Sequence, residues 1–111
     1  MQPNKIKSQK MRIFEVASMI QFSQKGHTKS VFYDSDRIKA QVMGFEPGQR
    51  IPPCKMDRDV VFFVLSGSGK IIVDGEEKKI EKHSWIFVPK EIESRSLQAD
   101  TRMSVLAIQL R

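Results

Sequence analysis

The sequence predicts an all-β fold, a sandwich or a barrel, formed by a single domain. From residue 28 onward, short segments rich in β-branched and aromatic residues recur at regular spacing, separated by turn residues. No sustained apolar period of 3.6 residues follows residue 28, which argues against an α/β fold. The length of 111 residues suits one core, because two shorter halves would each bury too little surface.

The predicted strands are separated by recognisable turns. Asp74-Gly75 is the strongest turn signal, because a type I′ hairpin of two residues needs positive φ at both. The glycines at 67 and 69 are predicted to form a further hairpin connection. The nine predicted strands span residues 30–33, 38–46, 51–56, 59–66, 70–73, 76–81, 84–88, 92–98 and 103–110.

The first 27 residues differ from the rest. Residues 1–12 carry four basic and few apolar side chains, so we expect a solvated basic arm. Residues 13–20 are dense in apolar side chains, and their pattern does not distinguish a short helix from a strand. We therefore divide the chain into an N-terminal arm with a short edge element, residues 1–27, and a barrel domain, residues 28–111.

Charge and cysteine content restrict the setting and the partners. The net charge of +6 would favour acidic partners, but the basic residues are interspersed with acids, as at residues 76–82. We therefore expect no nucleic-acid partner. No apolar run is long enough to span a membrane, so no membrane partner is expected either.

With Cys54 as the single cysteine no internal disulfide can form, which predicts a reducing, cytoplasmic location.

The run at residues 60–65 predicts a homodimer. It is apolar at every position, whereas a strand with one face in water would alternate apolar and polar residues. One face can point into the barrel, but so short a chain has little material left to cover the other. A second copy is the expected cover, and Trp85 and Phe87 are expected to serve core or dimer packing.

Residues 47–67 resemble the first signature of the cupin superfamily. In that signature a Gly is followed after five residues by His-x-His, then a Glu and a Gly, and Gly48 and Gly67 fall in register. Residues 88–94, with Pro89, resemble the second signature. The resemblance covers roughly residues 30–110. It implies a small double-stranded β-helix, or jelly-roll, barrel of the RmlC-like type, dimeric, with a ligand pocket in its mouth.

The same resemblance implies that the metal-ligand positions of the family have been replaced. Cys54 and Met56 stand at the two His positions, Val60 at the Glu position and Ser94 at the second-signature His position. Iron, manganese and zinc favour imidazole nitrogen and carboxylate oxygen, which these four residues do not offer. We therefore expect no metal and no cofactor.

The two histidines are expected to lie away from the barrel mouth. His27 precedes the strands and His83 falls in a turn. Neither residue is therefore expected to act as a metal ligand.

The leading hypothesis is a metal-free barrel that binds a small, largely apolar molecule. Two alternatives stay open: a metal-dependent enzyme of the isomerase or dioxygenase type with a soft-metal site at Cys54 and Met56, and a structural or regulatory dimer with a vestigial pocket. No catalytic residue is identified, and the replaced ligand positions favour binding over catalysis. The pocket is predicted to be lined by Cys54, Met56, Val60, Phe62, Ser94 and Ser96.

Overall fold

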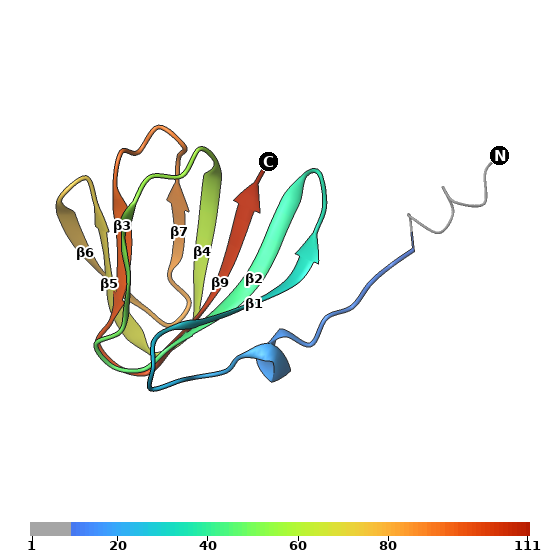
Figure 1. Ribbon diagram of the computed structural model, residues 1–111, viewed down its shortest axis with the longest axis horizontal. Helices are drawn as coiled ribbons and strands as arrows, with labels where there is room; N and C mark the ends of the chain where they lie inside the picture. Colours follow the sequence, from blue (N-terminus) through green and yellow to red (C-terminus); the bar gives the residue numbers. More distant parts are fainter. Residues whose placement is uncertain (1–9) are drawn as a thin grey trace.

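The computed structural model describes residues 10–111, which form two antiparallel β-sheets arranged as two layers (Figure 1). The five-stranded sheet has the order β1 (Thr28–Asp34), β2 (Ile38–Phe45), β9 (Met103–Leu110), β4 (Asp59–Ser66) and β7 (Trp85–Val88). The four-stranded sheet has the order β3 (Arg50–Cys54), β8 (Arg95–Ala99), β5 (Ser68–Val73) and β6 (Glu76–Glu81).

The predicted all-β jelly roll is confirmed, because each predicted strand overlaps an observed one and no helix interrupts residues 28–110. The two sheets form an open sandwich rather than a closed barrel. Most of the basic arm predicted at residues 1–12 lies outside the described residues. Within residues 10–111, no helix is long and apolar enough to cross a membrane.

Alternation along β4 divides its apolar run between two surfaces. Val60, Phe62 and Val64 are at most 2% exposed and point between the sheets, whereas Val61 and Phe63 are only partly buried on the outer face. The run therefore has two apolar faces, as its composition requires. The core between the sheets is completed by Met43, Phe45, Ile71, Ile80, Val88, Leu97, Ala99, Met103, Val105 and Ala107.

The hairpin between β5 and β6 has the predicted type I′ geometry, with φ of 48° at Asp74 and 83° at Gly75. Asp74 also contacts the residue before β8. Its backbone nitrogen donates to the carbonyl oxygen of Ser94 at 2.8 Å, and its Oδ1 accepts from the backbone nitrogen of Ser94 at 2.8 Å. This double contact fixes the position of the chain where β8 begins.

Strand β8 begins at Arg95, and not at the predicted residue 92. The preceding residues form a turn in which the backbone nitrogen of Ile92 donates to the carbonyl oxygen of Pro89 at 3.1 Å. Within β8, Leu97 and Ala99 point into the core. Because side chains alternate along a strand, Arg95 shares their face.

The hairpin predicted at Gly67 and Gly69 is wrong, because β4 and β5 lie in different sheets. Gly67 carries the chain between the sheets with a φ of 79°, and a Cβ there would overlap the carbonyl oxygen of Arg102. Gly69 already belongs to β5, and a Cβ on it would overlap the carbonyl oxygen of Gln98. Close backbone approach explains both glycines.

The segment before β1 packs on the outer face of the five-stranded sheet. It contains one short turn of 3-10 helix, Val16–Met19, within the region whose structure the sequence left open. Nearer to β1, the backbone of Gln21 approaches Gly44 of β2 so closely that a Cβ on Gly44 would overlap the Gln21 carbonyl oxygen. The outer face of β2 is therefore covered at this end by the chain itself.

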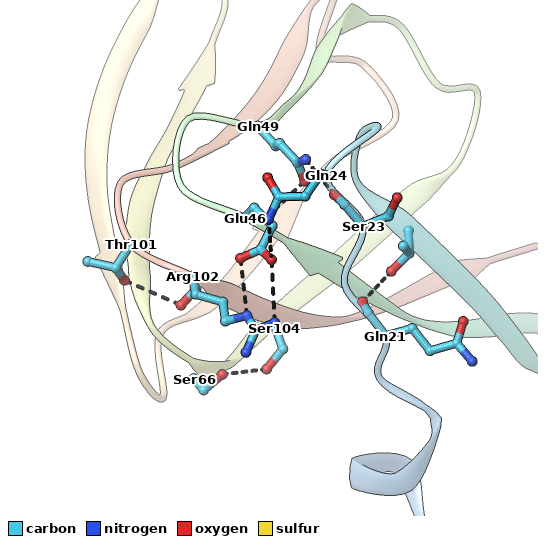
Figure 2. A network of polar contacts seen from close by, with 10 residues as sticks. Gln21, Ser23, Gln24, Glu46, Gln49, Ser66, Thr101, Arg102 and Ser104 are labelled. Atoms are coloured by element: carbon cyan, nitrogen blue, oxygen red, sulfur yellow. Dashed lines mark hydrogen bonds and ion pairs between the residues drawn. The ribbon is translucent and has the colours of Figure 1, made fainter.

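A polar network centred on Glu46 holds this segment in place (Figure 2). The Glu46 carboxylate accepts hydrogen bonds from Arg102 Nε at 3.1 Å and from Gln24 Nε2 at 3.2 Å. The guanidinium carbon of Arg102 also lies 3.9 Å from the ring centroid of Phe22. These contacts fix the stretch that leads into β1.

Replacing Gly67 with alanine should lower the free energy of unfolding by more than about 3 kcal/mol, because the new Cβ meets backbone that cannot move aside. Gly48→Ala is the matched control. Gly48 has a similar φ of 84° but open space around its Cβ position, so only the backbone conformation costs energy, about 1–2 kcal/mol. Chemical denaturation compares the two variants, and equal losses would contradict the close approach at Gly67.

Candidate functional site

A cavity of about 180 Å³ lies between the two sheets. Its apolar wall is formed by Met43, Ile51, Met56, Val60, Phe62 and Ala107. Its polar lining consists of His27, Lys29, Gln41, Cys54, Arg95 and Gln109. Among the described residues neither an aspartate nor a glutamate lines it, so any charge on its wall is positive.

Strand pairing explains where the cavity opens. Gln41 of β2 pairs with Ala107 of β9, which pairs in turn with Phe62 of β4, so these three residues form one row on the inner face. The small side chain of Ala107 leaves space between the two larger ones. A neighbouring row on the same face is filled by larger, buried side chains and belongs to the core: Met43, Val105 and Val64.

The side chain of Arg95 reaches from the four-stranded sheet into this space. The residue is 8% exposed, and its guanidinium carbon lies 5.4 Å from the ring centroid of Phe62 on the opposite sheet. Its Nη1 donates to Sγ of Cys54 at 3.5 Å, whereas its buried Nε has no hydrogen-bond partner among the described residues. A buried guanidinium without a carboxylate partner costs desolvation energy and leaves a strong donor unused.

Gln41 is the second buried polar group at the cavity. It is 8% exposed, and its Oε1 has no hydrogen-bond partner among the described residues. Buried side-chain polar atoms nearly always have a partner, whether protein, water or ligand. Gln41 and Arg95 are the two residues of the described chain that carry such unpaired buried atoms, and both line one cavity. The cavity thus gathers one unused acceptor and one unused donor.

The prediction that His27 lies away from the mouth is wrong. His27 lines the cavity, and its ring stacks on Phe45 with centroids 5.4 Å apart and an interplanar angle of 20°. The position follows from the course of the N-terminal segment over the sheet, which the sequence pattern did not predict. His83 lies in a turn with a φ of 75°, as predicted, and stacks on Phe63.

Four of the six predicted site residues meet at this cavity: Cys54, Met56, Val60 and Phe62. Cys54 is exposed, so it lies at the rim rather than in the depth of the cavity.

Ser94 and Ser96 do not line the cavity, and Arg95 between them does. The physical reason is the register of β8, in which the face that carries Leu97 also carries Arg95. This signal was present in the sequence, because the apolar residues Leu97 and Ala99 alternate with polar ones.

The residues at the cavity do not fit the metal that the cupin signatures imply. Three of the four positions that correspond to the metal ligands of the family line the cavity: Cys54 offers a thiol, Met56 a thioether and Val60 no donor atom. The fourth, Ser94, lies away from the cavity, where its backbone nitrogen donates to Asp74. Within residues 10–111, no group of three or more His, Cys, Asp or Glu side chains is arranged to hold a metal ion.

Arg95→Met should raise the free energy of unfolding by about 1 kcal/mol, because it removes a buried and partly unpaired guanidinium while keeping side-chain length. Arg102→Met is the control. Its side chain is 59% exposed and paired with Glu46, so a loss below about 1 kcal/mol is expected. Urea denaturation measures both changes. A loss of more than about 1 kcal/mol in Arg95→Met would instead identify the guanidinium as a structural part of the core.

Comparison with known sequences gives one partial relative. No protein-family model matches the chain. An uncharacterised protein of Aquifex aeolicus is 33% identical over 51 residues, which is 46% of this chain and 42% of that protein. The chain thus matches less than half the length of this curated relative.

Solved structures match most of the chain. An RmlC-like cupin protein from Desulfovibrio desulfuricans has a TM-score of 0.82 at 19% identity, covering 91% of this chain and 97% of that chain. A cupin superfamily protein from Desulfitobacterium hafniense has a TM-score of 0.79 at 20% identity, covering 91% and 92%. A salicylate 1,2-dioxygenase variant from Pseudoaminobacter salicylatoxidans has a TM-score of 0.72 at 22% identity, covering 78% of this chain and 26% of that one. The chain therefore has the RmlC-like cupin fold.

Proposed function

We propose that this chain is a metal-free member of the cupin superfamily whose cavity binds a small organic molecule. The observation that carries the proposal is the cavity of about 180 Å³ at which Cys54, Met56, Val60 and Phe62 meet. An apolar cavity of roughly 150 Å³ is large enough to hold benzene. The ligand is therefore the size of one small ring or a short chain.

The position of Arg95 supports a site without a metal. Its Nη1 lies 3.5 Å from Sγ of Cys54, the residue that replaces the first His of the family signature. A guanidinium remains charged at any pH that a protein tolerates, and in a partly buried site it repels a divalent cation. A soft metal at Cys54 and Met56 would have to displace this contact.

The open cavity favours binding over a vestigial pocket. Met56 and Phe62 line the cavity without filling it. Empty apolar volume costs stability, and the unpaired atoms of Arg95 and Gln41 add to that cost. A pocket that had lost its role would gain stability by closing.

The similarity to a dioxygenase does not extend this proposal to oxygenase chemistry. The chain spans 26% of that enzyme, and 22% identity supports the fold alone. The side chains at the inherited positions lack imidazole and carboxylate. We therefore propose binding rather than catalysis. A reducing, cytoplasmic location fits the free thiol of Cys54.

Protein purified without an affinity tag should contain no stoichiometric iron, manganese or zinc. Among the described residues at the cavity, His27 supplies one imidazole and Cys54 one thiol, no carboxylate joins them, and the Arg95 guanidinium repels cations. Elemental analysis measures the content. The variant Cys54→His, Met56→His, Val60→Glu with Arg95→Met supplies two imidazoles and a carboxylate, and it serves as a control that should acquire metal. One equivalent of iron, manganese or zinc in the natural protein would overturn the proposal, as would copper that is lost in Cys54→Ser.

A thermal-shift screen tests whether the cavity binds a small organic molecule. A library of small organic molecules should contain compounds that raise the melting temperature of the natural protein. Ala107→Leu fills the space between Gln41 and Phe62, so these compounds should not stabilise that variant. Compounds that stabilise both proteins equally would place binding elsewhere.

We also propose that two copies pair through the outer face of the five-stranded sheet. Trp85 and Phe87 are 63% and 46% exposed, and they pair in register with Phe63 and Val61 of β4. Exposed large apolar residues gathered on one sheet are typical of protein interfaces. The same apolar patch on a second copy is self-complementary, as a twofold dimer requires.

The N-terminal segment supports the same pairing. Residues 10–15 lie along this outer face, where Lys10, Arg12 and Phe14 line a hollow with residues of β1, β2 and β9, while Met11 is 87% and Ile13 79% exposed. Phe14 contacts Phe32 of β1, with ring centroids 5.3 Å apart, at an apolar hollow on this outer face. A partner that covers the face would also bury these side chains.

Sedimentation velocity at micromolar concentration should show a dimer, and Trp85→Glu should give a monomer, because a buried carboxylate in an apolar interface is costly. Lys78→Glu is the control. It places the same side chain on the exposed strand β6 of the other sheet and should leave the dimer intact. A monomeric natural protein would contradict the proposed pairing.

A further inference from the structure

Arg95 lines the cavity, and its guanidinium has an unused hydrogen-bond donor. Among the described residues, its guanidinium makes one hydrogen bond, the contact of 3.5 Å with Sγ of Cys54, and sulfur is a weak acceptor. Its Nε is buried without a partner among the described residues. In any guanidinium the Nε–H bond lies parallel to one Nη–H bond. These two parallel donors, the donor fork, can bind both oxygens of one carboxylate.

The anion for this fork has to come from a ligand. Among the described residues no acidic side chain lines the cavity, whereas Lys29 and His27 do. Lys29 adds a second positive charge at the wall, which raises the local concentration of small anions. The charge of the cavity therefore complements a carboxylate.

Gln41 places an acceptor on the opposite side of the open space. Its unpaired Oε1 is buried, and Gln41 belongs to the row in which Ala107 separates it from Phe62. The guanidinium of Arg95 lies over the Phe62 ring at the other end of that row. A molecule resting on the Ala107 methyl group would thus lie between Arg95, which has the unused donor, and Gln41, which has the unused acceptor.

We infer that the cavity is a site for a small hydroxycarboxylic acid, whose carboxylate binds Arg95 and whose hydroxyl group donates to Gln41. The inference rests on the proposed function, because it names the class of molecule that the cavity binds. The apolar wall formed by Met56, Val60 and Phe62 packs against the carbon skeleton between the two polar groups. The cavity volume of about 180 Å³ limits that skeleton to one ring or a short chain.

Isothermal titration of the natural protein tests the inference with three sets of probes. The three hydroxybenzoate isomers carry both polar groups at different separations, benzoate lacks the hydroxyl group, and the three hydroxybenzyl alcohols lack the carboxylate. The best hydroxybenzoate should bind roughly 10- to 100-fold more tightly than its alcohol, as expected for charged hydrogen bonds. It should also bind several-fold more tightly than benzoate.

Variants assign the two contacts. Arg95→Met should weaken hydroxybenzoate binding to the level of the alcohol, and Arg95→Lys, which keeps the charge without the fork, should give an intermediate affinity. Gln41→Leu should remove the advantage of hydroxybenzoate over benzoate. Arg102→Met, at an exposed arginine paired with Glu46, should bind as the natural protein does.

Each contrary result has a distinct meaning. Equal affinities for acids and alcohols, both lost in Ala107→Leu, would overturn this inference and leave the proposed small-molecule site standing. Inorganic phosphate that binds as tightly as the best hydroxybenzoate would overturn it in favour of a general anion site. Binding of none of the probes, or unchanged hydroxybenzoate binding in Arg95→Met, would also overturn it.

Discussion

The two hydrogen bonds between Asp74 and Ser94, each 2.8 Å long, set the register of β8, and the cavity depends on that register. Because side chains alternate along a strand, Arg95 and Leu97 point together between the sheets. A slip by one residue would turn Ser94 and Ser96 inward and expose Leu97. It would also remove the positive charge from the cavity. A turn in the β5–β6 hairpin thus determines the chemistry of a pocket formed with the opposite sheet.

The cavity carries costs that the rest of the structure offsets. Open volume beside Ala107 and unpaired buried atoms on Arg95 and Gln41 all lower stability. In the neighbouring rows, Phe45 and Val105 are completely buried. All of these destabilising features lie at one cavity. A ligand that fills the space and pairs the unused polar atoms would restore the lost stability, as expected of a binding site.

The strands could be predicted because their signals are local: alternation, β-branched residues and the turn at Asp74-Gly75. The positions of Cys54, Met56, Val60 and Phe62 at the cavity followed from signature spacing and alternation. Gln41 and His27 were missed because their positions depend on contacts between distant segments. Arg95 was missed although its alternation with Leu97 and Ala99 in the sequence points it inward. The register of β8 is fixed through Asp74, and the course of the N-terminal segment through Glu46. Gly67 was misassigned for the same reason, since no local signal shows that the chain changes sheets there.

A crystal structure of the tag-free protein, with anomalous data collected above the iron, copper and zinc edges, tests the central claim most directly. The account predicts that Arg95 lies inside the cavity beside Cys54, with no anomalous peak of a metal near Cys54 or Met56. It also predicts that Ser94 remains bonded to Asp74 outside the cavity. An ordered metal at the cavity, or a β8 register that turns Ser94 inward and Arg95 toward solvent, would contradict it.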